Sequence, residues 1–309
     1  MPELITVAIP TRNRPQLLVE ALRSCFDQTY RPLEIIIGDD STNDLSERAI
    51  ARLEVPSGID IRYVRNEKSL GQAGNVNNLF QLAKGHKLAI LHDDDLLLPD
   101  AIAELDACWQ VDTGITAAFG KQYLIREDGT VLSAESEHLN ISYYRTPDYE
   151  GTSLSSIEAA LVQQFPNDGY LLLTEAAQRV LYRSESEFGT NRWCDFDFGI
   201  RLAQQYEKFY FLNKYTAKYR LTSESVSKHG YPTYMYPLIE ELEVSPDTIW
   251  AKDVALKRLA PIVIYNYARL GAWKTALRIF CSRYYPLRKR ASPSGMKRLA
   301  SIVYYGLRS

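Results

Sequence analysis

Residues 88–100, with the sequence LAILHDDDLLLPD, constrain the fold most, because an apolar strand in this segment leads directly to three aspartates. The apolar run LAIL reads as a buried strand, and Asp93, Asp94 and Asp95 follow His92. Two carboxylates ~4 Å apart repel each other by ~1 kcal/mol in water and by ~4 kcal/mol near a protein surface. A hard divalent cation that also binds a substrate phosphate would offset this repulsion. We therefore expect a metal–diphosphate site at the carboxyl end of a parallel strand, where open α/β sheets bind ligands.

The same segment also fits a plainer interpretation, in which the acidic run is a solvated loop and Asp95 or Asp100 caps the following helix. Two other acidic motifs do not fit. A calcium loop needs glycine at its sixth position and glutamate at its twelfth, and this chain has Glu104 at the twelfth but Leu98 in place of the glycine. A phosphatase-type nucleophile needs threonine or valine where Leu97 stands.

The whole chain is compatible with a soluble globular protein. Its 309 residues suffice for one large domain with an appendage or for two domains, and the net charge is only −2. The four cysteines form no CxxC pair, which favours reduced thiols and a cytosolic location over a zinc site or a disulfide framework. The first residues lack the basic and apolar regions of a signal peptide, and no long apolar window predicts a membrane span.

The charge is unevenly distributed along the chain. Residues 254–309 contain twelve Lys or Arg and no Asp or Glu, with aromatic and aliphatic side chains between the charges. This pattern suits helices that lie on an anionic lipid surface. The alternative is that these helices pack on the rest of the chain or on a second subunit. Charge alone would also fit nucleic acid, but no nucleic-acid-binding module is recognisable, and we expect no such partner.

Apolar and amphipathic runs alternate over the first hundred residues, which predicts a βαβαβ order and a parallel sheet with right-handed crossovers. The expected strands are 4–10, 33–38 and 59–64, with helices beginning at Pro15, near Asp44 and after Gly74. Further along we expect strands at 115–119, 122–126 and 208–212, and helices at 155–164, 174–182 and 195–206. Residues 133–153 lack periodicity and are expected to form a mobile loop, and at least three helices should follow in the C-terminal region.

Three segments together resemble the family 2 glycosyltransferases, which have the GT-A fold. They are residues 7–44 (VAIPTRNRPQLLVEALRSCFDQTYRPLEIIIGDDSTND), residues 74–100 (GNVNNLFQLAKG leading into LAILHDDDLLLPD) and residues 193–220 (WCDFDFGIRLAQQYEKFYFLNKYTAKYR). The resemblance covers about residues 4–228. It implies an α/β, Rossmann-related and mostly parallel sheet flanked by helices, with a helical C-terminal region.

The resemblance also implies which region of the chain has which function. Residues 1–228 would be the catalytic domain, with a nucleotide-sugar-binding half over 1–100 and an acceptor-binding half over 101–228. Residues 229–309 would be the basic helical region. The reaction implied is an inverting sugar transfer (EC 2.4) from a nucleoside-diphosphate donor to a hydroxyl group.

For the donor, the resemblance implies that the loop after the first strand, with Pro10, Thr11, Arg12 and Asn13, lies along the base and ribose. The second aspartate of the DDS turn, Asp40, would accept a hydrogen bond from the imide of the base. An ordinary turn or N-cap aspartate is the alternative for Asp40.

The acidic motif of the family is often DxDD, and here His92 occupies its first acidic place. By resemblance Asp94 binds the metal, Asp93 faces the ribose or the diphosphate, and Asp95 supports the metal or faces the donor sugar. His92 is a ligand or a hydrogen-bonded core histidine. Asn77 would support the nucleotide, with a plain helix-surface asparagine as the alternative.

The catalytic base implied by the resemblance is Asp195, at the start of the third segment. Cys194 stands where the family usually has glutamate, which removes one carboxylate neighbour, and Asp197 follows two residues on. The structural alternative for Asp195 is an N-cap. As a base it would take the proton of the acceptor hydroxyl, which requires an approach of ~3 Å.

The implied cofactor is a divalent metal, Mn²⁺ or Mg²⁺. The expected donor is a UDP-sugar, with dTDP and GDP left open, and the expected acceptor is a lipid-linked glycan or a polysaccharide in cell-surface glycan synthesis. The expected location is cytoplasmic, on the membrane face if the basic helices bind lipid, and a homodimer is left open.

Two rival functions belong to other classes. A sugar-nucleotide nucleotidyltransferase would carry a glycine-rich phosphate loop after the first strand, and PTRNRP has no glycine. A non-catalytic nucleotide-sugar-binding module would not need Asp40, Asp94 and Asp195 together.

Overall fold

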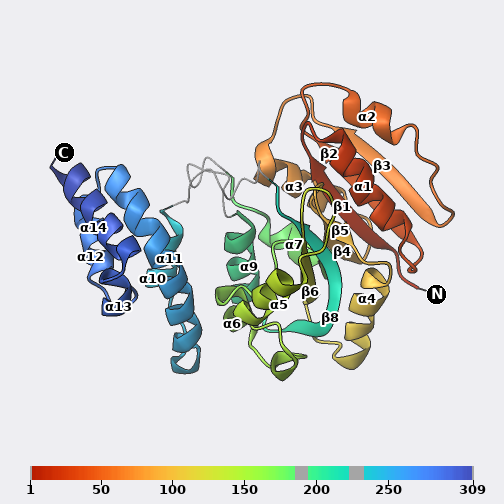
Figure 1. Cartoon of the computed structure of the whole chain (residues 1–309). Coiled ribbons are helices and arrows are strands. Elements are labelled where there is room, and N and C mark those ends of the chain that lie inside the picture. The colour runs from red at the N-terminus through yellow and green to blue at the C-terminus, as the bar shows by residue number, and fades with distance from the viewer. Residues whose placement is uncertain (1, 185–193, 223–232, 308–309) are drawn as a thin grey trace. The chain divides into compact units, whose positions relative to one another are not determined.

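The computed structural model describes residues 2–184, 194–222 and 233–307. The chain divides into two compact units, residues 1–223 and residues 224–309. We describe each unit by itself (Figure 1).

The first unit contains one sheet, which has eight strands among the described residues. Its strands are β1 (Ile5–Thr11), β2 (Leu33–Asp39), β3 (Ile59–Arg65), β4 (Lys87–Ile90), β5 (Leu96–Leu97), β6 (Ala117–Ile125), β7 (Tyr170–Leu173) and β8 (Phe209–Arg220). Their order is β3-β2-β1-β4-β7-β6-β8-β5. The first four are mutually parallel, as the βαβαβ pattern predicts. β7 runs antiparallel to both β4 and β6, whereas β8 is parallel to β6.

Helices cover both faces of this sheet. They are α1 (Pro15–Phe26), α2 (Leu45–Ile50), α3 (Gly71–Leu82), α4 (Ala101–Val111), α5 (Ser133–Ser142), α6 (Ser156–Leu161), α7 (Thr174–Val180) and α9 (Cys194–Gln205), with a short 3₁₀ helix η1 (Pro147–Tyr149). Ile5, Val7 and Ile9 of β1 share a buried cluster with α1 and α4. Side chains alternate along a strand, and α3 packs on the opposite face of β1 and β2, with α7 and α9 beyond it. The predicted mostly parallel α/β sheet flanked by helices is confirmed.

The mobile loop predicted for residues 133–153 is wrong, because α5 and η1 occupy that segment. The buried face of α5 is polar, so it carries no apolar periodicity. Ser136 Oγ accepts a hydrogen bond from the amide of Leu124, and the Asn140 side chain bonds the amide and the carbonyl of Gln122. This helix is therefore fixed to β6 by hydrogen bonds that a hydrophobicity pattern cannot reveal.

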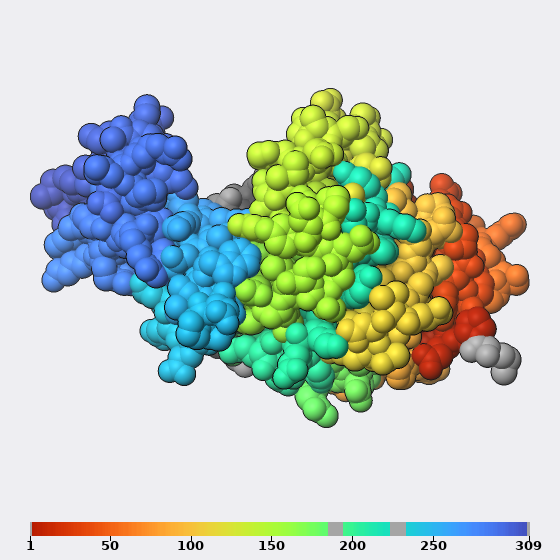
Figure 2. All heavy atoms as spheres, turned by 90° about the horizontal axis from the view of Figure 1, so that it is seen from below, coloured from red at the N-terminus to blue at the C-terminus, as the bar shows by residue number. Residues whose placement is uncertain are grey.

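The second half of the sheet also differs in detail from the prediction. The two strands expected at 115–119 and 122–126 are one strand, β6, with an irregular register between Phe119 and Gln122. β8 is longer than the expected strand at 208–212. Figure 2 shows part of β8 (teal) at the surface beside α4 (yellow), and Lys214 of β8 pairs with Glu104 of α4 at 2.6 Å.

The second unit is helical. It contains α10 (Met235–Glu241), η3 (Pro246–Thr248), α11 (Ile249–Arg269), α12 (Trp273–Phe280), α13 (Leu287–Arg290) and α14 (Pro293–Gly306). The long helix α11 packs against α10, α12 and α14 around Val263, Ile279 and Ile302, which are buried. The basic stretch therefore builds a core of its own. Within the described residues, none of the helices combines the length and the apolar run that a membrane crossing requires.

Candidate functional site

The carboxyl ends of β1, β2 and β4 lie at one edge of the sheet because these strands are parallel. β7 is antiparallel to β4, so the residues that precede β7 reach the same edge. The His92 amide there donates a hydrogen bond of 3.1 Å to Oδ2 of Asp168. Sequence reasoning missed Asp168. The turn NDG before an apolar strand was its only signal, and the direction of that strand was not predictable.

His92 lies among three carboxylates. Its Nδ1 is 3.9 Å from Oδ2 of Asp95 and from Oδ2 of Asp168, and its Nε2 is 3.7 Å from Oδ1 of Asp195. These distances are typical of ion pairs and are longer than those of ordinary hydrogen bonds. Burial alone would lower the pKa of His92, but these carboxylates raise it well above its usual value. The neighbouring carboxylates therefore favour the positively charged form of the imidazole.

Arg14 faces two of the three consecutive aspartates. Its Nη1 is 2.9 Å from Oδ2 of Asp94 and 3.4 Å from Oδ1 of Asp93. Thr11 Oγ1 donates a hydrogen bond of 2.7 Å to the other oxygen of Asp93. Burial, with the neighbouring Asp94, still raises the pKa of Asp93 to about 6. The repulsion expected in the acidic run is thus partly offset by an arginine of the chain, which sequence reasoning also missed.

Arg220, at the end of β8, holds the acidic loop from the other side. Its amide donates to Oδ1 of Asp95 at 2.6 Å, and its Nε donates to the carbonyl of Asp94 at 2.8 Å. Its Nη2 pairs with Glu20 of α1 at 2.6 Å. The second oxygen of Asp95 is buried and has no hydrogen-bond partner among the residues that the structure describes. Burial, Asp168 and Asp94 raise the pKa of Asp95 well above its usual value.

The residues at this edge fit a divalent cation. His92, Asp94 and Asp95 each offer a ligand atom, and these atoms lie within 4.8 Å of one another. The observation that favours a cation is that one buried Asp95 oxygen accepts no hydrogen bond from the described residues, which is costly for a carboxylate. Oxygen ligands suit Mn²⁺ or Mg²⁺. His92 could join only as a neutral imidazole, so Asp94 and Asp95 are the stronger ligands.

Asp40 is buried at the same edge, after β2. Its Oδ1 accepts hydrogen bonds from Asn66 Nδ2 at 2.7 Å and from the Leu70 amide at 3.1 Å, and its Oδ2 accepts one from Ser69 Oγ at 2.9 Å. It caps no helix, since the N-cap residue of α2 is Asp44. Asp40 therefore anchors the segment before α3 and keeps acceptor capacity for a further donor.

The loop after β1 is tied to the loop after β2. The Asn13 amide donates to Ser41 Oγ at 2.7 Å, and the Asn13 backbone has a φ of 56°. Pro10 and Thr11 belong to β1 itself, whereas the Arg12 side chain is exposed. The structure thus brings Thr11 and Asn13 to the sheet edge with fixed contacts and leaves Arg12 in solvent.

Asn77 of α3 differs from both expectations. Its Nδ2 donates to the Tyr182 carbonyl at 2.8 Å, and its Oδ1 accepts from the Tyr182 amide at 2.6 Å. Both ends of the amide group are therefore bonded to the backbone of one residue. Asn77 is a brace for Tyr182, neither a plain surface asparagine nor a group turned toward a ligand.

Asp195 lies in the first turn of α9, which begins at Cys194, so the N-cap alternative is wrong. The Tyr182 hydroxyl donates a hydrogen bond of 2.9 Å to Oδ1 of Asp195, and Gln72 Nε2 lies 3.5 Å from Oδ2. Burial raises the pKa of the Cys194 thiol well above its usual value, so Cys194 stays neutral beside Asp195. No sequence pattern indicated Tyr182 or Gln72 as neighbours of this carboxylate.

Asp197 has a different environment. It is fully buried, with Arg201 Nε at 2.8 Å and Arg183 Nη1 at 3.5 Å from its two oxygens. Two arginines hold it in buried ion pairs, so Asp195 is the carboxylate of α9 that remains for chemistry.

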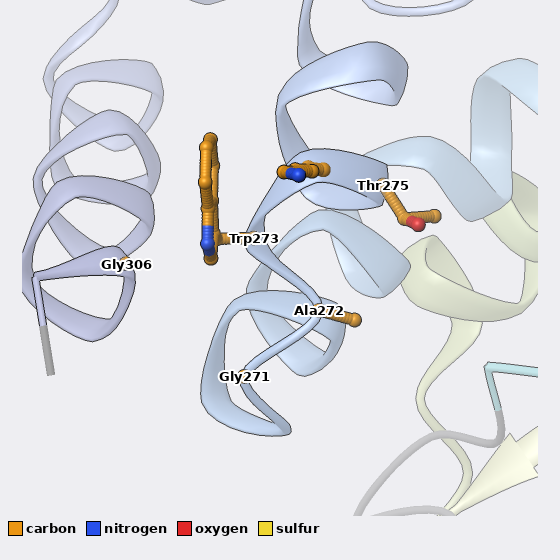
Figure 3. A pocket seen from close by; sticks show the side chains of 6 residues that line it. Gly271, Ala272, Trp273, Thr275 and Gly306 are labelled. Atoms are coloured by element: carbon orange, nitrogen blue, oxygen red, sulfur yellow. The ribbon is translucent and has the colours of Figure 1, made fainter. Parts of the chain in front are cut away.

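The second unit contains a pocket of about 520 Å³ between the start of α12 and the end of α14 (Figure 3). It is lined by Gly271, Ala272, Trp273, Lys274, Thr275 and Gly306. This lining offers no carboxylate or imidazole. We therefore assign the chemistry to the acidic edge of the first unit.

Residues 6–152 match the sequence model of the family described as Glycosyl transferase family 2. A protein of Campylobacter jejuni, GalNAc(5)-diNAcBac-PP-undecaprenol beta-1,3-glucosyltransferase, is 34% identical over 132 residues. The match covers 42% of this chain and 41% of that protein, so the chain spans about two fifths of this relative's length.

Two solved structures resemble the whole fold. S. aureus TarS 1-349 in complex with UDP-GlcNAc superposes with a TM-score of 0.68 at 13% identity, over 97% of this chain and 88% of that one. A mannosyltransferase from Pyrobaculum calidifontis in complex with GDP-Man and Mn²⁺ gives a TM-score of 0.58 at 16% identity, over 98% and 86%. At these identities the likeness establishes a GT-A-like fold and nothing more specific.

Proposed function

Since the chain carries a family 2 glycosyltransferase domain over residues 6–152 and has a GT-A-like fold, we propose that it is an inverting glycosyltransferase. It would move a sugar from a nucleoside-diphosphate donor to a hydroxyl group of a glycan. In this proposal residues 1–100 bind the donor, residues 101–228 bind the acceptor, and residues 229–309 are an additional helical region.

One observation carries the proposal. Asp195 of α9 and the acidic loop after β4 come from distant parts of the chain, yet they meet at His92, with 3.7 Å between His92 Nε2 and Asp195 Oδ1. A cation-binding group and a partly buried carboxylate thus share one site. That is the pair of functions that sugar transfer from a diphosphate requires, namely stabilisation of the leaving group and deprotonation of the acceptor.

The residues of the chain have distinct tasks in this reaction. Asp195 accepts the proton of the acceptor hydroxyl as that oxygen attacks the anomeric carbon. The Tyr182 hydroxyl orients one Asp195 oxygen and leaves the other, near Gln72, to face the acceptor. Mn²⁺ or Mg²⁺ held by Asp94 and Asp95 would stabilise negative charge on the leaving diphosphate. A single displacement inverts the anomeric configuration.

We propose a UDP-sugar as donor, with GDP and dTDP sugars as alternatives. The similar TarS structure holds UDP-GlcNAc. The similar mannosyltransferase from Pyrobaculum calidifontis holds GDP-Man. The donor's base and ribose would lie along Pro10, Thr11, Arg12 and Asn13. Asp40, which keeps free acceptor capacity beside that loop, would take the hydrogen bond of the base imide.

We propose a lipid-linked glycan or a polysaccharide as the acceptor, used at the cytoplasmic face of a membrane. The name of the Campylobacter jejuni relative includes PP-undecaprenol. In this chain, the support comes from α14. Met296, Ala300, Val303 and Leu307 recur at helical spacing on it and are exposed, and Lys297 is exposed beside them.

We define Met296, Ala300, Val303 and Leu307 as the apolar stripe, and the helix α13, which packs against α14, also carries exposed basic side chains. Leu287 on α13 is 74% exposed, next to exposed Arg288 and Lys289. An apolar stripe with basic neighbours suits anionic lipid, at about 1 kcal/mol for each Lys or Arg near the surface. Two arginines of the basic stretch instead form ion pairs inside the second unit. Arg278 pairs with Glu240, and Arg283 pairs with Asp253.

Nucleotide binding tests the catalytic proposal. Thermal-shift measurements with UDP, GDP, dTDP and CMP, each with and without Mn²⁺, should show one nucleoside diphosphate that raises the melting temperature, and more so with Mn²⁺. CMP serves as the monophosphate control. A chain that responds to none of the diphosphates under either condition would contradict the proposal.

Vesicle co-sedimentation tests the lipid proposal. The full chain should sediment with vesicles containing about one-quarter phosphatidylglycerol and much less with pure phosphatidylcholine. The double substitution Val303→Asp with Leu307→Asp should abolish sedimentation. Val111→Asp is the matched control, because Val111 on α4 of the first unit is also exposed, at 73%. Equal sedimentation of both variants would discard the stripe as a lipid-binding surface.

A further inference from the structure

Arg14 occupies a position that no sequence pattern assigned to it. It is the N-cap residue of α1, followed by Pro15 at the first helical position. Its side chain turns to the acidic loop, where Nη1 contacts both Asp94, at 2.9 Å, and Asp93, at 3.4 Å. The side chains are only partly exposed, 25% for Arg14 and 16% for Asp94, so solvent screens this pair incompletely.

Asp94 can therefore interact with two different positive charges. It is paired with Arg14, and it belongs to the group with His92 and Asp95 that can hold a cation. A divalent cation bound to Asp94 would stand close to the guanidinium. Two positive charges at such separations repel each other strongly when water is partly excluded. The pair and the bound cation are consequently in competition.

We propose that Arg14 is an internal counter-ion of the acidic loop, which is displaced from Asp94 when a divalent cation binds and is then available to the diphosphate of the donor. The proposal rests on the proposed function for the identity of that anion, but the competition for Asp94 does not depend on turnover. Guanidinium suits both partners, because its planar donors match carboxylate and phosphate alike.

This competition predicts the direction in which the removal of Arg14 changes the affinity for the cation. In the absence of donor, Arg14 weakens cation binding, so its removal must tighten it. The arginine also relieves the repulsion between Asp93 and Asp94, so its removal must destabilise the metal-free protein. A residue that merely supports the fold of the loop would give the opposite first result, since a disordered loop binds metal less well.

Mn²⁺ titration of the full chain without nucleotide, followed by electron paramagnetic resonance of free Mn²⁺, measures this directly. Arg14→Gln should bind Mn²⁺ about fivefold more tightly than the wild type, a change equal to about 1 kcal/mol. Arg14→Lys keeps the charge and should fall between the two. Arg23→Gln is the matched control, because Arg23 is exposed on the same helix, and it should stay within about twofold of the wild type.

Thermal unfolding supplies an independent readout. Without metal, Arg14→Gln should melt below the wild type, and Mn²⁺ should raise its melting temperature more than it raises that of the wild type. If Arg14→Gln does not fold, Arg14→Lys still reports the sign of the affinity change. The proposal is overturned if these variants bind Mn²⁺ as the wild type does or more weakly, or if no form of the chain binds Mn²⁺.

The two hypotheses can fail separately. Unchanged Mn²⁺ affinity in Arg14→Gln, together with sugar transfer by the wild type, would contradict the counter-ion role of Arg14 and support the proposed glycosyltransferase activity. Tighter Mn²⁺ binding in Arg14→Gln, with no nucleoside diphosphate bound by any form, would support the counter-ion role of Arg14 and contradict the proposed nucleoside-diphosphate donor.

Discussion

Nε2 of His92 lies 3.7 Å from Oδ1 of Asp195, and this approach joins the loop after β4 to the first turn of α9. The imidazole lies among carboxylates that raise its pKa well above the usual value and so favour its charged form. It therefore keeps the proposed base next to the proposed cation group without a covalent or hydrogen-bonded link between them.

Replacement of the proposed base should remove catalysis and preserve donor binding. Asp195→Asn should lower kcat at least about a hundredfold, the usual effect of losing a general base, with the donor KM within about threefold of the wild type. Steady-state kinetics with the donor found in the nucleotide screen measures both. Asp148→Asn, an exposed aspartate of η1, makes the same chemical change as a control. Equal kcat in Asp195→Asn and Asp148→Asn would exclude Asp195 as the base.

Tyr182→Phe removes the hydroxyl that orients Asp195. We expect kcat to fall about tenfold, because a hydrogen bond to a charged group contributes roughly 1.5 kcal/mol or more, while the donor KM stays unchanged. The backbone at this position should hold, since Asn77 bonds both sides of the Tyr182 peptide and Arg201 bonds the carbonyls of Val180 and Leu181. Tyr265→Phe, at an exposed tyrosine, is the control. A kcat equal to that of the control would show that the hydroxyl is dispensable.

Asp93 should make the metal-free protein less stable as the pH rises. Its pKa is raised to about 6 in the folded chain, against about 3.9 in an unfolded one. Between these values the folded state binds more protons, so the free energy of unfolding falls from about pH 4 to about pH 6.5, by up to roughly 3 kcal/mol. Urea unfolding at pH 5 and pH 7 measures this fall, and Asp93→Asn should reduce it. Identical pH dependence in both proteins would refute the assignment.

Arg220→Lys should destabilise the first unit by about 2–3 kcal/mol, because lysine cannot reproduce the bonds of the buried guanidinium to Asp94 and Glu127 carbonyls and to Glu20. Glu20→Gln removes only the half-exposed partner and should change the free energy of unfolding by less than about 1 kcal/mol. Urea midpoints of the two variants make the comparison. If Glu20→Gln is as destabilising as Arg220→Lys, the bonds to the acidic loop contribute little.

The sequence predicts the first half of the fold well, because buried parallel strands such as Leu33–Asp39 are continuous apolar runs whose neighbours in sequence are also neighbours in space. It also places Asp93, Asp94 and Asp95 at the correct edge. It could not place Asp168, because β7 reverses direction relative to β4. It could not find Arg14 either, since a side chain that turns back from a helix start leaves no periodic signal.

Polar packing explains most of the remaining differences. Asn140 and Ser136 lie on the buried face of α5, and because that face is polar, the sequence of this helix resembles that of a loop. Asn77 reads as a surface or ligand-binding asparagine because only the fold brings it to Tyr182. In each case the decisive interaction is a hydrogen bond between distant segments, which a single sequence does not encode in its pattern.

Metal removal gives the most direct test of the central claim, that the acidic edge holds a cation and the diphosphate of a sugar donor. The measurement is release of nucleoside diphosphate from UDP-, GDP- and dTDP-sugars by the wild type, with Mn²⁺ or after chelation with EDTA, beside Asp94→Asn. We predict release from at least one donor with Mn²⁺, loss of release after chelation, recovery when Mn²⁺ is restored, and little release by Asp94→Asn at any Mn²⁺ concentration. No release from any donor, or equal release by Asp94→Asn after chelation, would contradict the account.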